Sequence, residues 1–317
     1  MRSDSCASVY SGDVDPLTDL LSRARATGSL FAETTMRGRG GLELGAEPSP
    51  LALHVVRVGP LWLRALGSTT LLGTGDVVLV RGGNPVCFRA GPEEPAAPLS
   101  ELLAAGESMP GVNRLDLPGP GPAAVLLCGA YSLEGSVCDR LLDMLPPVAH
   151  VPAAAGSLSR VVHVLYDELD DVAPGQQTAL DRVLDLLLVH VLRAHFATGA
   201  AVPAWFGALQ DPAVGRALEA LHGDPAAAWT VGGLARTVGL SRAALARRFS
   251  AAVGEPPLTY LTRWRIDLAK EALHRDGSTL ASVAREVGYA SEFALSAAFR
   301  RTVGEAPGRW RERTRAE

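Results

Sequence analysis

The feature that most constrains the fold of this chain is an internal repeat near its C-terminal end. One copy begins at Val238 and reads "VGLSRAALARRFSAAVGEPPLTYLTRWR", and the other begins at Val287 and reads "VGYASEFALSAAFRRTVGEAPGRWRER". At a spacing of 50 residues, a serine, leucine, phenylalanine, valine, glycine and proline recur: Ser241/Ser291, Leu245/Leu295, Phe249/Phe299, Val253/Val303, Gly254/Gly304 and Pro257/Pro307. The element before each turn repeats at a spacing of 49, so the second turn is one residue longer. The chain therefore builds the same small structure twice.

Each copy predicts two short helices joined by a tight turn. Leu245, Phe249 and Val253 lie four residues apart and form one buried stripe of a helix. The helix before it ends at Gly239, because glycine adopts the left-handed conformation that closes a helix. The same pattern in both copies predicts helices over 231–238, 241–253, 280–287 and 291–303. Such a helix-turn-helix unit places its second helix in the major groove of DNA.

A continuous helical pattern over residues 257–274, "PLTYLTRWRIDLAKEALH", connects the two copies. Eighteen residues at about 1.5 Å each span about 27 Å. The two second helices are therefore expected near the roughly 34 Å repeat of one DNA turn, on one face of the duplex. Side chains that commonly cap helices precede the predicted elements: Asp211 (followed by Pro212), Thr230, Ser241, Thr279 and Ser291.

Residues from about 206 to 313 resemble the DNA-binding domain of the AraC family of bacterial transcription regulators. The stretch "ASVAREVGYASEFALSAAFRRTVGEAPGRWR" is similar to the family's signature in its second helix-turn-helix unit. The resemblance implies seven helices, two helix-turn-helix units with a connecting helix, and a sequence-specific regulator that binds double-stranded DNA. Two matches in tandem, with their buried positions in register, favour DNA binding over ordinary helical hairpins with solvated arginines.

The resemblance also implies which side chains lie against the DNA. By position, the family's base-reading sites correspond to Ala243, Ala246 and Arg247 in the first unit and to Glu292, Phe293, Ser296 and Ala297 in the second. Arg247 is the best candidate for a bidentate contact with guanine, and the alanines favour methyl contacts or shape readout. The predicted DNA-binding surface also includes Arg242, Ser291, Arg300 and Arg301.

The first 150 residues predict a β-rich domain. Gly and Pro turn signals separate short apolar runs: "LALHVVRVG", "PLWLRALG", "DVVLVRGG", "PVCFRAG" and "AAVLLCGAYSL". Such runs are typical of strands in a small barrel or sandwich. We expect "AGPEEPAAP" and "DLPGPGPA" to be loops, because proline donates no ladder hydrogen bond. This region resembles the cupin-type N-terminal domain of one branch of the AraC family, which implies a cupin-like β-barrel.

The pattern becomes helical after about residue 157. A helix is expected at 158–169, and a second helix carries an apolar stripe at Leu180, Val183, Leu184, Leu187, Leu188, Val191 and Leu192. These helices bury their stripes either on their own domain or in a dimer interface. The overall prediction is an α+β chain with a sensing domain at 1–150, a helical connector at 151–204 that serves possible dimerisation, and an all-α DNA-binding domain at 205–317.

Most of the metal ligands that the cupin resemblance implies are missing. After "GD", a cupin leads through a proline to a metal-binding histidine, whereas this chain has Arg81 near the proline position and Cys87 at the histidine position. His54 is the remaining candidate from the first ligand group. Two candidates fall short of the three or four ligands that a metal requires. We therefore predict no metal, no cofactor and no catalytic residue; the rival hypothesis is a cupin metalloenzyme fused to a helical module.

Two kinds of signal are compatible with the predicted sensing domain. A small apolar or aromatic effector would bind in the barrel near His54, Trp62 and Phe88. Alternatively, Cys87 and Cys128 would sense reactive chlorine or other oxidants, as cysteines do in some relatives with this domain, and Arg89 would favour the thiolate. The commonest use of such cysteines is as buried inert thiols, and the commonest use of such a histidine is a hydrogen bond to a neighbour.

The distribution of charge agrees with a DNA partner. The chain has a net charge of −4, but residues 205–317 hold 16 Lys and Arg against 12 Asp and Glu. A basic end on an acidic chain suggests a polyanion as its partner. Because no run approaches about 18 uninterrupted apolar residues, we expect no membrane helix. We predict a cytoplasmic homodimer that binds DNA and a small-molecule or oxidant effector, with RNA polymerase as a further candidate partner.

Overall fold

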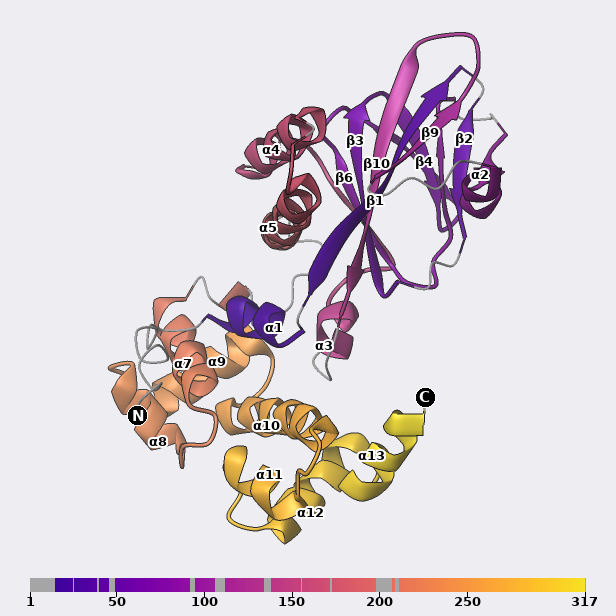
Figure 1. Ribbon diagram of the computed structural model, residues 1–317. Coiled ribbons are helices and arrows are strands. Elements are labelled where there is room, and N and C mark those ends of the chain that lie inside the picture. The colour runs from indigo at the N-terminus through magenta and orange to yellow at the C-terminus, as the bar shows by residue number, and fades with distance from the viewer. Residues whose placement is uncertain are drawn as a thin grey trace. The chain divides into compact units, whose positions relative to one another are not determined.

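The computed structural model has an α+β fold that divides into two compact units (Figure 1). One unit contains β-sheets and lies within residues 25–134 and 140–202; the other is helical and lies within 1–24, 135–139 and 203–317. The structure describes residues 15–24, 26–38, 40–45, 49–91, 95–105, 112–133, 138–154, 156–171, 173–197, 207–208 and 211–316. The domain boundary predicted at 204/205 lies outside the described residues. No helix in these ranges is long and apolar enough to cross a membrane.

The sheet unit contains two β-sheets. The six-stranded sheet has the order β11-β6-β3-β10-β1-β9, and its strands are β11 (Val148–Val151), β6 (Val77–Arg81), β3 (Leu51–Val58), β10 (Ala123–Ser132), β1 (Thr27–Arg37) and β9 (Asn113–Leu117). The five-stranded sheet has the order β5-β4-β7-β2-β8, with strands β5 (Ser68–Leu72), β4 (Leu61–Ala65), β7 (Val86–Arg89), β2 (Gly41–Leu44) and β8 (Ala97–Pro98). The five apolar runs singled out in the sequence are β3, β4, β6, β7 and β10.

The prediction of a closed barrel is wrong, because the described strands form two separate sheets. The sequence had left open whether these strands belong to a barrel or a sandwich. The five-stranded sheet ends at β8, which comes from the segment "AGPEEPAAP". This segment was expected to be a loop, but its last two residues form an edge strand. This strand is only Ala97–Pro98, and Pro98 has no N–H with which to continue the sheet. Part of the second expected loop, residues 116–117, likewise belongs to an edge strand, β9.

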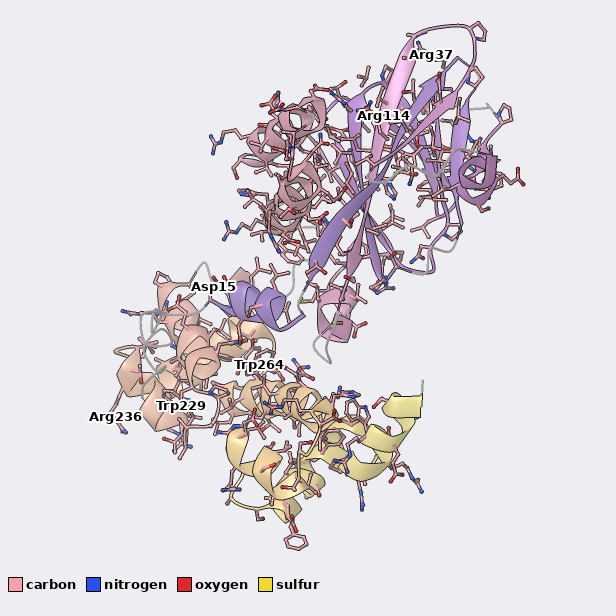
Figure 2. All side chains as sticks on the ribbon, in the orientation of Figure 1. Asp15, Arg37, Arg114, Trp229, Arg236 and Trp264 are labelled. Carbon is pink, nitrogen blue, oxygen red and sulfur yellow. The ribbon has the colours of Figure 1, made fainter. Side chains whose placement is uncertain are left out.

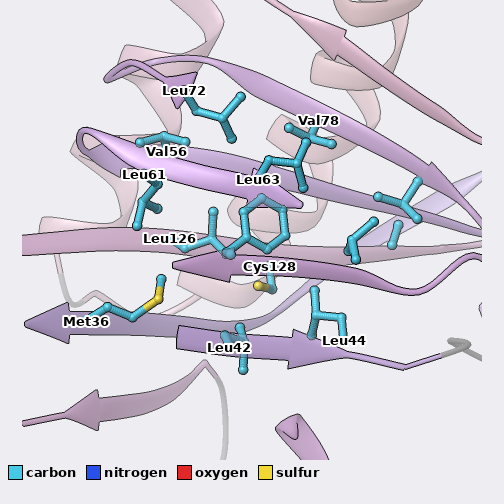
Figure 3. Close-up of a cluster of buried hydrophobic side chains, with 14 of the residues drawn as sticks. Met36, Leu42, Leu44, Val56, Leu61, Leu63, Leu72, Val78, Leu126 and Cys128 are labelled. Carbon is cyan, nitrogen blue, oxygen red and sulfur yellow. The ribbon is translucent and has the colours of Figure 1, made fainter. Parts of the chain in front are cut away.

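The core of the sheet unit lies between the two sheets. Strand β4 alternates buried Leu61, Leu63 and Ala65 with more exposed residues, as a strand with one buried face should. These side chains join inward-facing residues of the other sheet, including Leu126 and Cys128 of β10, in one apolar cluster (Figure 3). Strand β3 is instead buried over six consecutive residues, because helices cover its second face.

Helices α4 (Leu158–Asp170) and α5 (Gln176–Ala197) cover the outer face of the six-stranded sheet (Figure 1). The Tyr131 hydroxyl of β10 donates to the carbonyl oxygen of Leu184 at 2.7 Å, and Gly28 N–H of β1 donates to Asp185 at 2.9 Å. A Cβ at Gly28 would lie 2.7 Å from the Leu184 Cβ, so only glycine allows this close approach. Most of the predicted apolar stripe of α5 is therefore buried on its own domain, which was one of the two alternatives. Two short helices, α2 (Leu99–Ala105) and α3 (Cys138–Asp143), complete the connections.

The helical unit is built around the helix that connects the two repeats. This helix, α10 (Pro257–His274), buries Trp264 and Ile266 completely. Trp264 is labelled in Figure 2. The described helices around it are α1 (Pro16–Ala24), α7 (Pro212–Gly223), α8 (Val231–Thr237), α9 (Arg242–Val253), α11 (Leu280–Glu286), α12 (Glu292–Val303) and α13 (Pro307–Ala316). The helices predicted at 231–238, 241–253, 257–274, 280–287 and 291–303 are confirmed to within one residue at each end.

Helix α1 was not predicted, and it packs in the helical unit although it precedes the first strand. Its buried Asp19 carboxylate lies 2.7 Å from Nδ1 of His222 in α7. Nε2 of His222 lies 2.7 Å from the Tyr260 hydroxyl of α10, and the His222 ring lies 4.5 Å from that of Trp264. The contact joins residues about 200 positions apart, so no local pattern in the sequence predicts it.

Candidate nucleic-acid interface

The first helix-turn-helix unit consists of α8 and α9. Thr230 accepts a hydrogen bond from Gly233 N–H at 2.9 Å at the start of α8, and Ser241 accepts from Ala244 N–H at 3.2 Å at the start of α9. Gly239 lies in the turn with φ of 73°, in the left-handed region that favours glycine. The predicted buried stripe of α9, Leu245, Phe249 and Val253, is confirmed. One face of α9 is thus fixed in the core, and the opposite face is left to solvent.

The second unit, α11 and α12, repeats this construction. Thr279 and Ser282 cap α11 reciprocally, Gly288 takes φ of 80° in the turn, and Ser291 accepts from Ala294 N–H at 3.2 Å. Leu295 and Phe299 are fully buried. Val303 is only half-buried, contrary to the prediction, because Ala298 rather than Val303 completes the buried face.

The exposed face of α9 carries two arginines near its N-terminal end. Arg242, Ala243 and Arg247 are exposed, and Ala246 is half-buried. The next arginine, Arg248, has a different role: its Nε and Nη2 donate to the Asp211 carboxylate at 3.0 and 2.8 Å.

Asp211 also caps α7 through the N–H groups of Ala213 and Val214. Burial of Asp211 opposes ionisation, but Arg248 and these two N–H groups hold the pKa of Asp211 below its ordinary value. The ion pair therefore ties Arg248 to the start of α7, so that of these two adjacent arginines only Arg247 is left to contact a partner.

The exposed face of α12 carries an aromatic ring at the corresponding end. The Phe293 side chain is 79% exposed, and no other large apolar side chain among the described residues is as exposed. Ala297, Arg300, Arg301 and the cap residue Ser291 are exposed as well, whereas Glu292 and Ser296 are half-buried. Water contact on most of a phenyl ring is unfavourable, so such a ring commonly marks a contact surface. The predicted DNA-binding residues of each unit thus lie on the outer face of its second helix, at the edge of that face, or at the helix cap.

Two of the residues predicted to sense a signal, His54 and Cys128, come together in the core of the sheet unit. His54 Nδ1 lies 3.3 Å from the Cys128 Sγ, and its ring lies 5.0 Å from that of Phe88. Burial lowers the pKa of His54 to about 3, so the imidazole is neutral at physiological pH. Among the described residues, neither His54 Nε2 of β3 nor the buried hydroxyl of Thr34 in β1 has a hydrogen-bond partner.

The other two predicted sensing residues, Cys87 and Trp62, do not face this core. Leu61 and Leu63 of β4, and Val86 and Phe88 of β7, point inward, so the residues between them point outward. Cys87 lies on this outer face, where the Arg89 Nε donates to its Sγ at 3.1 Å. A shallow cavity of about 330 Å³ lies there, lined in part by Glu43, Arg64, Cys87 and Arg89. The expectation that Trp62 lines the interior with His54 is therefore wrong, because strand alternation turns it outward.

Cys87 and Cys128 do not lie together. Cys87 belongs to the five-stranded sheet and faces outward, whereas Cys128 belongs to the six-stranded sheet and faces the core. Cys87, Cys128 and Cys138 are all buried. Among the residues that the structure describes, no three His, Cys, Asp or Glu side chains gather as metal ligands would.

Known proteins share both halves of this architecture. A cupin family model matches residues 15–197, and a helix-turn-helix domain model matches residues 234–313. A Streptomyces lividans protein described as an AraC-like transcription regulator is 37% identical over 305 residues, which cover 94% of this chain and 98% of the relative. The chain belongs to the AraC family of transcription regulators. A Streptomyces antibioticus relative with the same description is 36% identical over 94% of this chain and 99% of its own length.

The helical part of the chain is also similar in sequence to a solved structure. The DNA-binding domain of AdpA, in complex with a target DNA, is 33% identical and covers 33% of this chain and 91% of that chain, with a TM-score of 0.30. Membership of the family identifies this chain as a DNA-binding transcription regulator. Its relatives are regulators rather than enzymes, so the rival hypothesis of a cupin metalloenzyme has no support.

Proposed function

We propose that this AraC-family regulator places α9 and α12 in successive major grooves of one DNA duplex. The observation that carries the proposal is the repeated construction of the two units. In each, a serine caps the second helix, an apolar stripe fixes its inner face, and the predicted base-reading residues lie on or at the edge of its outer face. The N-terminal residues of such a helix contact base edges.

Within the first unit, Arg247 is the residue proposed to read guanine. Its guanidinium is exposed, and two parallel N–H groups of an arginine match the O6 and N7 acceptors of guanine. Arg248 is the adjacent arginine and would be the alternative, but its Nε and Nη2 both donate to the Asp211 carboxylate. Arg242, Arg300 and Arg301 are proposed to contact phosphates, since they are exposed cations on or beside the same faces.

Hydroxyl-radical footprinting of the full chain on selected DNA tests this docking. We expect two protected blocks about 10 base pairs apart. Ala243→Asp should remove protection of one block and Ala297→Asp that of the other, because each places a carboxylate against the phosphates. Ala197→Asp makes the same chemical change at an exposed position of α5 and should leave both blocks intact. Loss of neither block in the first two variants would contradict the proposal.

We further propose that the core of the sheet unit binds a small, neutral and mainly apolar effector. The supporting observation is that two buried polar atoms of this unit, His54 Nε2 and Thr34 Oγ1, have no hydrogen-bond partner among the described residues, in otherwise apolar surroundings. A buried polar group without a hydrogen bond is costly, so a ligand hydroxyl or carbonyl that bonds it gains free energy. A charged ligand is disfavoured there, because the neutral His54 offers no countercharge.

Thermal unfolding with benzyl alcohol or benzoate, two probes with one ring and different charge, tests the effector proposal. Benzyl alcohol at about ten times its Kd should stabilise the wild type by about 1.4 kcal/mol, and benzoate should not. The double variant Thr34→Val, His54→Leu should lose the response to benzyl alcohol. The outward-facing Cys87→Ser should keep it. Equal stabilisation by the two probes, or an unchanged response in the double variant, would contradict a neutral polar anchor in the core.

The remaining functional predictions differ in their support. The alternative of an oxidant sensor that uses Cys87 and Cys128 is not supported, and the two thiols face opposite sides of different sheets. We propose a homodimer through α4 and α5, on which Val164 and Leu186 are large apolar side chains about half exposed to solvent. Leu186→Arg should then give a monomer in size-exclusion chromatography with light scattering. RNA polymerase is a further candidate partner.

A further inference from the structure

The two helix-turn-helix units meet at a second point besides α10. The loop after α7, residues 224–229, leads into the first unit, and the turn between α11 and α12 belongs to the second. These two backbones lie in contact: a Cβ built on Gly288 would lie 2.5 Å from the Ala226 carbonyl oxygen. Gly288 also has φ of 80°, so both its conformation and its surroundings exclude a larger residue.

A single arginine of α10 lies at this contact. The Arg265 Nε donates to the Pro225 carbonyl oxygen at 2.6 Å, and its Nη2 donates to that of Ala227 at 2.7 Å. The guanidinium carbon Cζ of Arg265 lies 5.8 Å from the ring centroid of Tyr289, which follows Gly288 in the turn of the second unit. The Arg265 guanidinium therefore makes two kinds of contact. It donates hydrogen bonds to a loop of the first unit, and it lies over an aromatic ring of the second unit.

This group of residues, Pro225, Ala226, Ala227, Arg265, Gly288 and Tyr289, is called the joint. Arg265 and Tyr289 are half-buried, and burial lowers the pKa of the Arg265 guanidinium, with Tyr289 and Asp224 opposing the shift. The loop has its own hydrogen bonds, since Ala227 N–H donates to the Asp224 carboxylate and the Trp229 Nε1 donates to the Asp224 carbonyl oxygen. A structured loop and a rigid arginine fork make the joint a fixed connection rather than a flexible one.

We infer that Arg265 is a positioning residue that fixes α9 relative to α12, and thereby fixes the spacing of the two blocks of DNA that the protein accepts. The inference rests on the proposed function, in which both helices bind one duplex. One additional base pair moves the second block by about 3.4 Å and turns it by about 34° around the axis. A protein with a fixed joint loses contacts at one block when this happens. A protein with a loose joint moves the second unit and keeps them.

The experiment measures the affinity of the full chain for an operator before and after a single base pair is inserted between the two protected blocks. The operator is selected from random DNA with the wild-type protein, and footprinting locates the blocks. We expect the insertion to weaken wild-type binding at least about 30-fold, the loss of one or two base contacts. The insertion should weaken the binding of Arg265→Ala by less than about fivefold. It should weaken the binding of Arg265→Lys by an intermediate amount, because an ammonium group lacks the planar fork.

Each variant is compared with itself on the two DNAs, so a general loss of stability or affinity cancels. Arg263→Ala is the matched control, since it removes an exposed arginine of the same helix that pairs with Glu255 outside the joint. This control should show the same insertion penalty as the wild type, where the insertion penalty is the fold loss of affinity when one base pair is inserted. Gly288→Ala provides a second route, because its methyl group would push the Ala226 backbone away without touching the charge of Arg265. It should also reduce the penalty or move the preferred spacing by one base pair.

The possible failures can be told apart. If the wild type shows two protected blocks and a large penalty, and Arg265→Ala and Gly288→Ala both keep that penalty, the joint does not set the spacing and the inference is overturned. If the wild type protects one block and tolerates the insertion, the docking of both helices on one duplex is itself wrong, and the inference falls with it.

Discussion

The two helix-turn-helix units have the same interior and different exteriors. Both second helices begin at a capping serine and end at a left-handed glycine, Gly254 with φ of 84° and Gly304 with φ of 91°. In both, the buried phenylalanine packs edge-on against an aromatic ring of the following helix: Phe249 against Tyr260 at 5.9 Å, and Phe299 against Trp310 at 5.8 Å. The two units therefore bury equivalent side chains in the same arrangement.

On the exterior, equivalent positions carry different chemistry. Arg242, Ala243 and Arg247 in the first unit correspond to Glu292, Phe293 and Ala297 in the second. The first helix thus presents cations and small side chains, and the second presents an aromatic ring beside a carboxylate. Since buried positions specify the fold and exposed positions specify the contact, the comparison indicates that the two units read different base sequences.

The support behind the two units differs as well. The first unit packs on α7, whose buried His222 is held between Asp19 of α1 and Tyr260 of α10. The second unit has His274 beside Trp310 at 5.0 Å, but this histidine is exposed. The first unit therefore depends on a helix from the far end of the chain.

Truncation of the two core phenylalanines tests the shared interior and should have the largest effect. Both rings are completely buried, so Phe249→Ala and Phe299→Ala should each lower the free energy of unfolding of the helical unit by about 3–5 kcal/mol. Urea unfolding followed by tryptophan fluorescence measures both. Costs that differ by more than about 2 kcal/mol would show that the two interiors are not energetically equivalent.

Removal of the Asp19 carboxylate tests the unequal support. Asp19→Ala should lower the free energy of unfolding by about 2–3 kcal/mol, because it leaves His222 buried without this partner. A double-mutant cycle with His222→Ala isolates the coupling of the two side chains. Additive losses in that cycle would mean that the contact contributes nothing of its own, and that α1 supports the first unit only by apolar packing.

Substitution of Arg247 tests the exterior of the first unit. Arg247→Ala should weaken operator binding by about 2 kcal/mol and abolish the preference for guanine at one position. Replacing that guanine with 7-deazaguanine, which lacks the N7 acceptor, should weaken the wild type but leave the variant unaffected. Anisotropy titrations measure both effects. Equal loss on every DNA sequence would instead identify Arg247 as a phosphate contact.

Substitution of Phe293 tests the exterior of the second unit and should have the smallest effect. We expect the ring to contact a thymine methyl group, the apolar feature of the major groove. Replacing that thymine with uracil should cost the wild type about 0.8 kcal/mol, the value of one buried methyl group. Phe293→Ala should bind the two DNAs equally. A variant that still distinguishes thymine from uracil at every position would remove Phe293 from base reading.

Sequence reasoning succeeded where structure depends on neighbours in the chain. The caps at Asp211, Thr230, Ser241, Thr279 and Ser291 all accept the expected backbone hydrogen bonds. Strands with a continuous apolar run were found, such as β3 and β6, whereas the central strand β1, "TGSLFAETTMR", was missed because polar residues interrupt its pattern. The base-reading residues came from the family resemblance, and Arg247 was singled out among them by its chemistry.

The sequence by itself determined the duplicated helix-turn-helix units, since helical periodicity, capping and left-handed turns act over a few residues. Only the tertiary structure decided that Trp62 and Cys87 face outward, that α1 joins the helical unit, and that Arg265 meets both repeats. Those outcomes depend on which strand pairs with which and on which helix face meets another, across separations of tens to hundreds of residues. No local pattern encodes such pairings, because packing and long-range hydrogen bonds select them when the whole chain folds.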